Sequence, residues 1–286
     1  MLGRMGLPLV AGVLWLLPGA APGGQPAASG PVPDVRQLML EVEAHQKALD
    51  KVRENYTFTS FDTTEDVDKA GRVTKTQTEE DDNFFVNGHW IARTVAKDGK
   101  PLSGHALDEE DARVKKLVEK AEKTPPGQPL RGPAISVSRL LDLMDVRNPR
   151  RVEFRGRPTI VFDFAGRRDV RTHGLAEDMS KKLEGTLWVD EADLQVAQLE
   201  VRFDENFHVA GGLVATIEKG TQMRFEQAPQ AGGLWLPTGG EGTITARLLL
   251  VKGIRQRVTE RDFGFKQFHV EAEQEKGART VPGKVQ

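Results

Sequence analysis

The chain has 286 residues, and its 40 lysines and arginines nearly balance 42 aspartates and glutamates, which gives a formal net charge of −2. Such a balance provides no global attraction to nucleic acid. The absence of cysteine excludes disulfides, thiolate metal sites, a cysteine nucleophile and a lipid-bearing cysteine.

The N-terminus has the pattern of a signal peptide. One cation, Arg4, precedes an apolar run over residues 6–17, and small residues and prolines follow. This order is typical of export signals, and the run is shorter than the roughly 20 apolar residues that a spanning helix needs. We therefore expect residues 1–28 to be cleaved, which leaves a periplasmic protein with no lipid anchor and no transmembrane segment.

The first predicted element of the mature chain is a helix over residues 33–55. Asp34 is placed to cap it, and apolar positions recur at spacings of three and four. These positions would form one face laid against a sheet, with His45 as a packed residue: Val35, Leu38, Val42, His45, Leu49 and Val52.

Alternating strands are predicted from residue 55 to residue 97, with Asn87-Gly88 as a two-residue hairpin turn. Residues 107–123 begin with acids and continue with bases, which suits the helix dipole, and their thin apolar stripe indicates a largely solvated helix. Residues 135–146 read as a third, short helix or an apolar segment. Together these segments form a helical insertion around 105–148.

The rest of the chain reads as antiparallel β structure, because short turns join its strands. A hairpin is expected about Gly156, with Ile160, Phe162 and Phe164 on one face, and residues 184–203 form the next pair of strands. Ala197, Leu199, Val201 and Phe203 are expected on one face by alternation. We expect both strand groups in one sheet, a single domain over residues 29–270 and a polar tail over 271–286.

The turn inside residues 184–203 contains three carboxylates, Asp190, Glu191 and Asp193. They are either a metal or acid–base site or the turn of a hairpin. Because aspartate stabilises turns through its own backbone, the turn is the favoured interpretation.

No catalytic motif stands out. The chain has no G-x-S-x-G elbow, no H-E-x-x-H pair and no phosphate-binding glycine loop, and its six histidines are scattered. The acidic runs at 79–82 and 108–111 lack the spaced ligands and glycine of a calcium loop. We predict no catalytic residue, no metal and no cofactor, and hence no enzyme. A deep cleft that collects His173 or His208 with acidic residues would revive the enzyme alternative.

An arginine-rich stretch runs from Arg147 to Arg171, with eight arginines against three acids. It is either a pair of solvated loops or a contact with an anionic surface such as lipid headgroups, since guanidinium groups bind phosphate well. The candidate residues for such a contact are Arg150, Arg151, Arg155, Arg157, Arg167 and Arg168.

An apolar sheet face must be covered by helices, by a second sheet or by an apolar ligand. If a ligand covers it, the inward residues of the later strands would line the cavity. These residues are Leu199, Val201, Phe203, Met223, Phe225, Leu248 and Leu250.

From about residue 35 to residue 268 the chain resembles the LolA/LolB-like superfamily of exported bacterial proteins for outer-membrane lipoprotein sorting, many of them uncharacterised. The most specific part is G-T-L-W-V-D followed later by G-L-W-L-P. The resemblance implies an α+β fold: a strongly curved antiparallel sheet, an incomplete β-barrel, covered on its concave face by helices. The helix after Asp34 and the one near Leu140 would form the lid.

The resemblance also implies a function. Such a protein would be a periplasmic, non-enzymatic carrier or sensor that binds an acyl chain, a lipid or a lipoprotein in an apolar half-barrel. The alternative is a structural or regulatory protein of the cell envelope that acts through a protein partner and has no ligand cavity.

Overall fold

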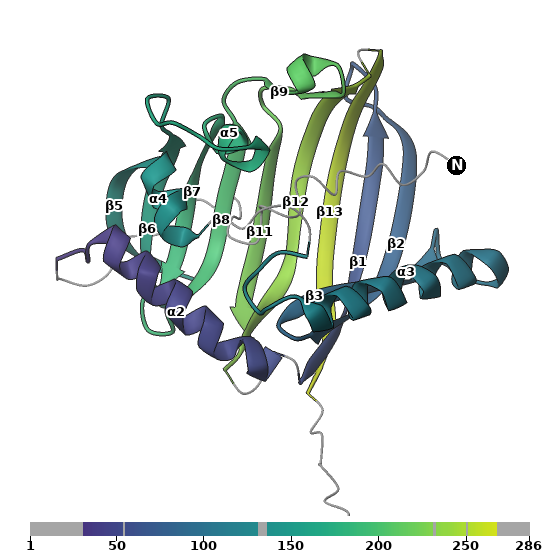
Figure 1. The fold of residues 1–286 in the computed structure, drawn as a ribbon, viewed down its shortest axis with the longest axis horizontal. Helices are drawn as coiled ribbons and strands as arrows, with labels where there is room; N and C mark the ends of the chain where they lie inside the picture. Colours follow the sequence, from purple (N-terminus) through teal and green to yellow (C-terminus); the bar gives the residue numbers. More distant parts are fainter. Residues whose placement is uncertain (1–30, 54, 131–135, 231–232, 250, 268–286) are drawn as a thin grey trace, which may run out of the picture.

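The computed structural model describes residues 31–53, 55–130, 136–230, 233–249 and 251–267. The predicted signal peptide and the polar tail lie outside these residues. Within them the fold is α+β, with one large antiparallel sheet and few helices, as the sequence predicts (Figure 1).

The described strands form one 13-stranded sheet in the order β4-β3-β2-β1-β13-β12-β11-β8-β7-β6-β5, with β10 paired to β12 and β9 paired to β10. The strands are β1 (Tyr56–Val67), β2 (Val73–Val86), β3 (His89–Lys97), β4 (Lys100–Pro101), β5 (Met144–Phe154), β6 (Arg157–Gly166), β7 (Leu183–Asp190), β8 (Gln195–Phe203), β9 (Phe207–Val209), β10 (Ala215–Ile217), β11 (Gln222–Pro229), β12 (Trp235–Leu248) and β13 (Lys252–Gln267). The helices are α2 (Val35–Arg53), α3 (Gly104–Lys123), α4 (Val137–Leu143), α5 (Leu175–Ser180) and the 3₁₀ turn η1 (Ala210–Gly212).

The two predicted strand groups are joined because β1 pairs with β13. The ladder runs antiparallel from Tyr56 opposite Gln267 to Asp66 opposite Gln256. This pairing places the first meander beside the last strand, so the single sheet is confirmed.

The strong curvature is a wrong prediction, because the sheet is not strongly curled (Figure 1). Bulges bend strands, and six of the ladders contain a register shift, but the central ladder between β12 and β13 runs from Gly239 opposite Arg261 to Leu248 opposite Lys252 without one. The helices also cover only part of one face. In Figure 1, α2, α4 and α5 lie over β5–β8, and α3 crosses the lower ends of β1–β3.

Two predicted hairpin turns are confirmed by their backbone angles. Asn87 and Gly88 have φ of 50° and 75°, and Arg155 and Gly156 have φ of 54° and 76°. Both central residues of a type I′ turn need positive φ, which asparagine and glycine adopt most readily.

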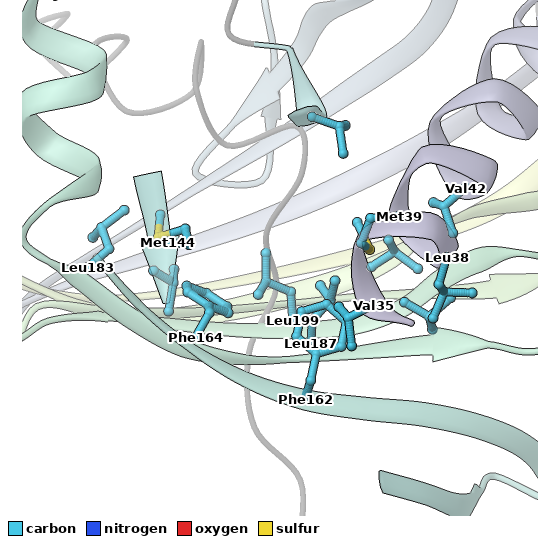
Figure 2. Close-up of a cluster of buried hydrophobic side chains, with 14 of the residues drawn as sticks. Val35, Leu38, Met39, Val42, Met144, Phe162, Phe164, Leu183, Leu187 and Leu199 are labelled. Carbon is cyan, nitrogen blue, oxygen red and sulfur yellow. The ribbon is translucent and has the colours of Figure 1, made fainter. Parts of the chain in front are cut away.

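Helix α2 begins where the sequence predicts, because the Asp34 carboxylate accepts the Gln37 backbone N–H at 2.9 Å. Its buried stripe contains Val35, Leu38 and Val42, which pack on sheet residues such as Leu199 (Figure 2). His45 is half-buried and hydrogen-bonds Gln195 through Nδ1 at 3.0 Å, so it is the packed residue that we expected.

Ala197 corrects the predicted alternation of β8. The register between β7 and β8 shifts between Trp188 and Val189, so β8 carries one extra residue there. Leu199, Val201 and Phe203 belong to the cluster under α2, whereas Ala197 packs on the opposite face. The bulge turns this side chain over, because one added residue reverses the faces of a strand. Its cluster there contains Val152, Val161, Trp188 and Trp235.

Helix α3 is anchored by a buried charge. Its partly exposed apolar stripe agrees with the predicted solvated helix, but the side chain of Glu110 is only 1% exposed. Glu110 Oε1 accepts the Thr94 backbone N–H at 2.9 Å, and Oε2 accepts Arg113 Nε at 2.9 Å. Helix α3 is thereby attached to β3 through a polar group that periodicity does not reveal.

Replacing Glu110 by alanine is expected to lower the free energy of unfolding by about 3 kcal/mol, because it leaves Arg113 and the Thr94 N–H without their buried partner. Urea denaturation measures the loss. The exposed neighbour Glu109 is the matched control, and Glu109→Ala should change stability by less than about 0.5 kcal/mol. Equal losses in both variants would contradict the anchoring role.

Candidate functional site

An apolar pocket lies between helix α4, helix α2 and strands β5–β7. Every side chain that borders it is apolar, and its free volume is about 40 Å³. Such a volume admits about one water-sized group. The lining residues are Met39, Val137, Leu140, Leu141, Met144, Val146, Phe162, Phe164 and Leu187.

Helix α4 closes this pocket and is held by polar contacts at the surface. Ser136 caps its first turn by accepting the Arg139 backbone N–H at 3.2 Å. Arg139 Nη2 pairs with Glu177 of α5 at 2.7 Å, and Asp142 pairs with Arg36 of α2 at 2.6 Å. The Arg139 guanidinium lowers the pKa of Glu177 to about 2. Helix α4 therefore has apolar contacts on the side of the pocket and two ion pairs on the other side, one exposed and one partly buried.

The residues predicted to line a cavity lie elsewhere on the same sheet. Leu199, Val201 and Phe203 are buried in the cluster that includes the apolar stripe of α2, and Met223 packs against that cluster. Phe225 and Leu248 are half-buried, and Leu250 lies outside the described residues. None of the six described residues borders the pocket, so their contact with a ligand stays a prediction.

A second, larger hollow is polar. It has about 690 Å³ of volume, is open to solvent and is lined by charged residues such as Lys181, Lys182 and Asp204. Lys182 pairs with Glu205, and Arg168 pairs with Asp204. His208 borders this hollow together with Asp204 and Glu205 and hydrogen-bonds Thr216 at 3.1 Å. Both acids pair with cations, and the hollow is open to solvent rather than a deep cleft. Because these charges are already paired and exposed, the small apolar pocket is the better candidate for an apolar ligand.

On the face of the sheet that the helices cover, a single row of side chains across the strands changes from apolar to acidic. Directly opposed residues of paired strands share a face, and the pairs link Leu187, Leu199, Phe225, Gly240, Glu260, Asp62 and Glu79 in that order. The row is apolar as far as β11 and acidic from β13 onward. Gly240 of β12 separates the two halves.

Several carboxyl groups of the acidic half have pKa values well above those of free aspartate and glutamate. Burial raises the pKa of Asp62 and of Glu260 to about 8, and that of Asp262 to about 7. Burial also raises the pKa of Asp81 on β2. Neighbouring carboxylates add to the increases, because each ionised group repels the next.

The six arginines predicted to contact an anionic surface each pair with a carboxylate of the chain. The partners at the β5–β6 end are Asp163 for Arg150, Glu191 for Arg151, Glu226 for Arg155 and Asp190 with Asp193 for Arg157. At the other end of β6, Arg167 pairs with Asp169 and Arg168 with Asp204. Their contact with an external anion stays a prediction, and their charges are already largely compensated.

The three carboxylates Asp190, Glu191 and Asp193 belong to the turn of a hairpin, as predicted. Asp190 Oδ1 accepts the backbone N–H groups of Ala192 and Asp193 at 3.1 and 2.8 Å. Asp193 accepts the indole N–H of Trp235 at 2.9 Å. These bonds fix the β7–β8 turn and attach it to the outer face of the sheet.

The part of the chain that the structure describes holds no group of three or more histidines, aspartates or glutamates placed to bind a metal ion. No helix there is long and apolar enough to cross a membrane.

The pocket residues are not evident from the sequence, because the chain changes from helix to strand at the pocket. Residues 135–146 were expected to be one helix or one apolar segment, but α4 ends at Leu143 and β5 begins at Met144. The signal that was present is the apolar face of β6, where Phe162 and Phe164 share a side as predicted.

No family model matches the chain, and no curated protein matches it. The chain is similar in structure to a domain from Vibrio parahaemolyticus provisionally described as an outer membrane lipoprotein-sorting protein domain. The similarity covers 84% of this chain and 95% of that one, with 12% sequence identity and a TM-score of 0.39.

The acidic half predicts a stability that falls as pH rises. Asp62, Glu260 and Asp262 bind protons more tightly when folded than at the unfolded values near 4. Their contribution is therefore complete below about pH 4 and is lost as pH rises toward 8. Urea denaturation should show a free energy of unfolding at least about 2 kcal/mol lower at pH 8 than at pH 5.

The variant Asp262→Asn removes one of these titrating carboxyl groups. Its free energy of unfolding should therefore fall less between pH 5 and pH 8 than that of the wild type. The control is Asp169→Asn, because the Arg167 guanidinium lowers the pKa of the exposed Asp169, which titrates below this range. A wild-type stability that is constant or rises from pH 5 to pH 8 would refute the raised pKa values.

Proposed function

We propose that this protein is a periplasmic, non-catalytic carrier or sensor that binds an acyl chain of a lipid or lipoprotein under helix α4. The observation that carries the proposal is the all-apolar lining of the pocket between α4 and strands β5–β7. An apolar site closed by a short helix suits a flexible hydrocarbon chain, which offers no polar group to recognise.

The driving force would be burial of the chain, at about 0.8 kcal/mol for each buried methylene. Because the free volume is about 40 Å³, α4 must move outward before more than one or two methylenes enter. The exposed ion pair Arg36–Asp142 resists this movement only weakly, whereas the partly buried pair Arg139–Glu177 must break or move together with α5. The acidic half of the face would keep the chain on the side of β5–β11.

In this proposal residues 29–270 form one domain after removal of residues 1–28. Leu199, Val201 and Phe203 form the floor of the widened site. Met223 and Phe225 extend the site along β11, and Leu248 and Leu250 remain candidates for contact with the ligand. The six arginines at the two ends of β6 remain candidates for contact with anionic headgroups.

The alternative is an envelope protein that acts through a protein partner and whose apolar side chains form only a core. The small free volume favours it, because a well-packed core leaves few voids larger than a water molecule. The two functions differ in whether α4 opens.

A reversible tether between α2 and α4 tests that movement. The chain has no cysteine, so Arg36→Cys/Asp142→Cys offers two unique thiols where the helices are joined by an ion pair at 2.6 Å. A thiol-cleavable bifunctional linker between them should weaken binding of a fluorescent long-chain fatty acid by at least about tenfold, because opening of α4 is blocked. Reduction of the linker should restore binding.

The matched control places the same linker on a single helix, with Glu43→Cys/Lys47→Cys on α2, and should bind as the wild type does. Binding that ignores the α2–α4 tether would mean that the chain enters elsewhere. Protein that binds no acyl probe, and that carries no lipid in native mass spectrometry, would refute the carrier and support the alternative.

A further inference from the structure

Two loops meet at the end of the sheet that is farthest from α3. The loop around η1 ends in Leu213 and Val214, and the β12–β13 turn holds Leu249 and Val251 (Figure 1). The Leu249 backbone N–H donates to the Val214 carbonyl at 3.1 Å, so the loops are joined. We name these four residues the apical patch.

The apical patch is unusually exposed for its composition. Its four side chains are between 48% and 86% exposed, and Val251 is the most exposed. The other exposed large apolar residues of the described chain lie on regular elements: Leu40 and Val52 on α2, Val73 on β2, Leu175 on α5 and Phe263 on β13. Single exposed apolar residues are ordinary, whereas a contiguous group marks an interaction site.

The backbone conformation of the β12–β13 turn indicates that the stability of the fold is not the reason for an apolar side chain at Leu249. Leu249 has a φ of 48°, in the left-handed region that glycine and asparagine adopt readily and that leucine rarely adopts. A leucine in this position makes the turn less favourable locally. Its side chain is also left in solvent, so it gains no burial within this chain.

Positive charge surrounds the patch. Lys252 follows Val251, and the neighbouring β1–β2 hairpin carries Lys69 and Lys75; none of the three forms an ion pair within the described residues. Arg255 attaches this hairpin to β13 by donating to the Asp68 carbonyl at 3.4 Å. Three of the nearby acids are compensated, since Glu218 pairs with Arg247, Asp68 with Arg72 and Glu65 with Arg257. Asp66 accepts a hydrogen bond from the neutral Gln256 at 2.9 Å, so the three lysines outnumber this one acid.

We propose that the apical patch inserts into the interfacial layer of an anionic lipid bilayer, with the surrounding lysines on the headgroups. Apolar tips of this kind enter the boundary between headgroups and acyl chains, and lysine is attracted to an anionic leaflet. A stable protein interface buries about 1,000 Å² or more, and two turns with four apolar side chains offer only a few hundred. This surface is independent of the acyl-binding proposal.

Vesicle binding tests the proposal with protein recovered from the exported fraction of cells that express the full chain. Sedimentation should show binding to vesicles of phosphatidylcholine with phosphatidylglycerol, and weaker binding to phosphatidylcholine alone. Leu249→Ser/Val251→Ser should weaken binding to the anionic vesicles by at least about tenfold, because both apolar anchors are lost. Lys252→Glu should weaken it by about fivefold or more and reduce its salt dependence.

The matched control is Val52→Ser, which removes an exposed valine of α2 beside the start of β1, at the opposite end of the sheet (Figure 1). This variant should bind both kinds of vesicle as the wild type does. Urea denaturation checks that all variants keep wild-type stability, as expected for exposed positions.

Binding that the apical substitutions leave unchanged, or no binding to anionic vesicles, would overturn the proposal. So would a dimer that dissociates in Leu249→Ser/Val251→Ser without any vesicle binding, because the occupant would then be a second copy of this chain.

Discussion

The pairing of β1 with β13 is the constraint on which the rest of the fold depends. The paired residues are separated by about two thirds of the chain, and without this ladder the first meander and the later strands would be separate sheets. The same pairing places Asp62 opposite Glu260. Ionised carboxylates directly opposite each other destabilise a sheet, so their protonation and the long-range pairing are two aspects of one arrangement.

That arrangement divides one face of the sheet into two environments. Over β5–β11 the face is apolar and carries α2, α4 and α5, and over β13–β3 it is acidic and carries α3 (Figure 1). Each helix matches the surface beneath it: Leu38 of α2 lies on leucine and phenylalanine, whereas Glu110 of α3 meets a backbone N–H and an arginine. An apolar ligand would therefore find suitable contacts on only one half of the face.

The features that were predicted correctly depend on residues that are close together in the sequence. Asn87-Gly88, the Asp34 cap and the alternation of Phe162 with Phe164 each involve residues close in sequence, and all three have the predicted form. Ala197 was misplaced because the register shift depends on the partner strand. The acidic row was invisible for the same reason, since Asp62 and Glu260 meet only through pairing between distant strands. The strong curvature was predicted only from the resemblance to the LolA/LolB-like superfamily, and the sheet does not have it.

An open sheet has edge strands, among them β4 and β5, to which another copy of the chain could add at high concentration. β4 is only two residues long, and β5 combines a register shift between Arg147 and Arg150 with Pro149, which has no N–H to donate. Charge, proline and a bulge on an edge strand keep other strands from adding to it. The arginines of β5 thus oppose fibre formation between copies of the chain, whatever else they bind.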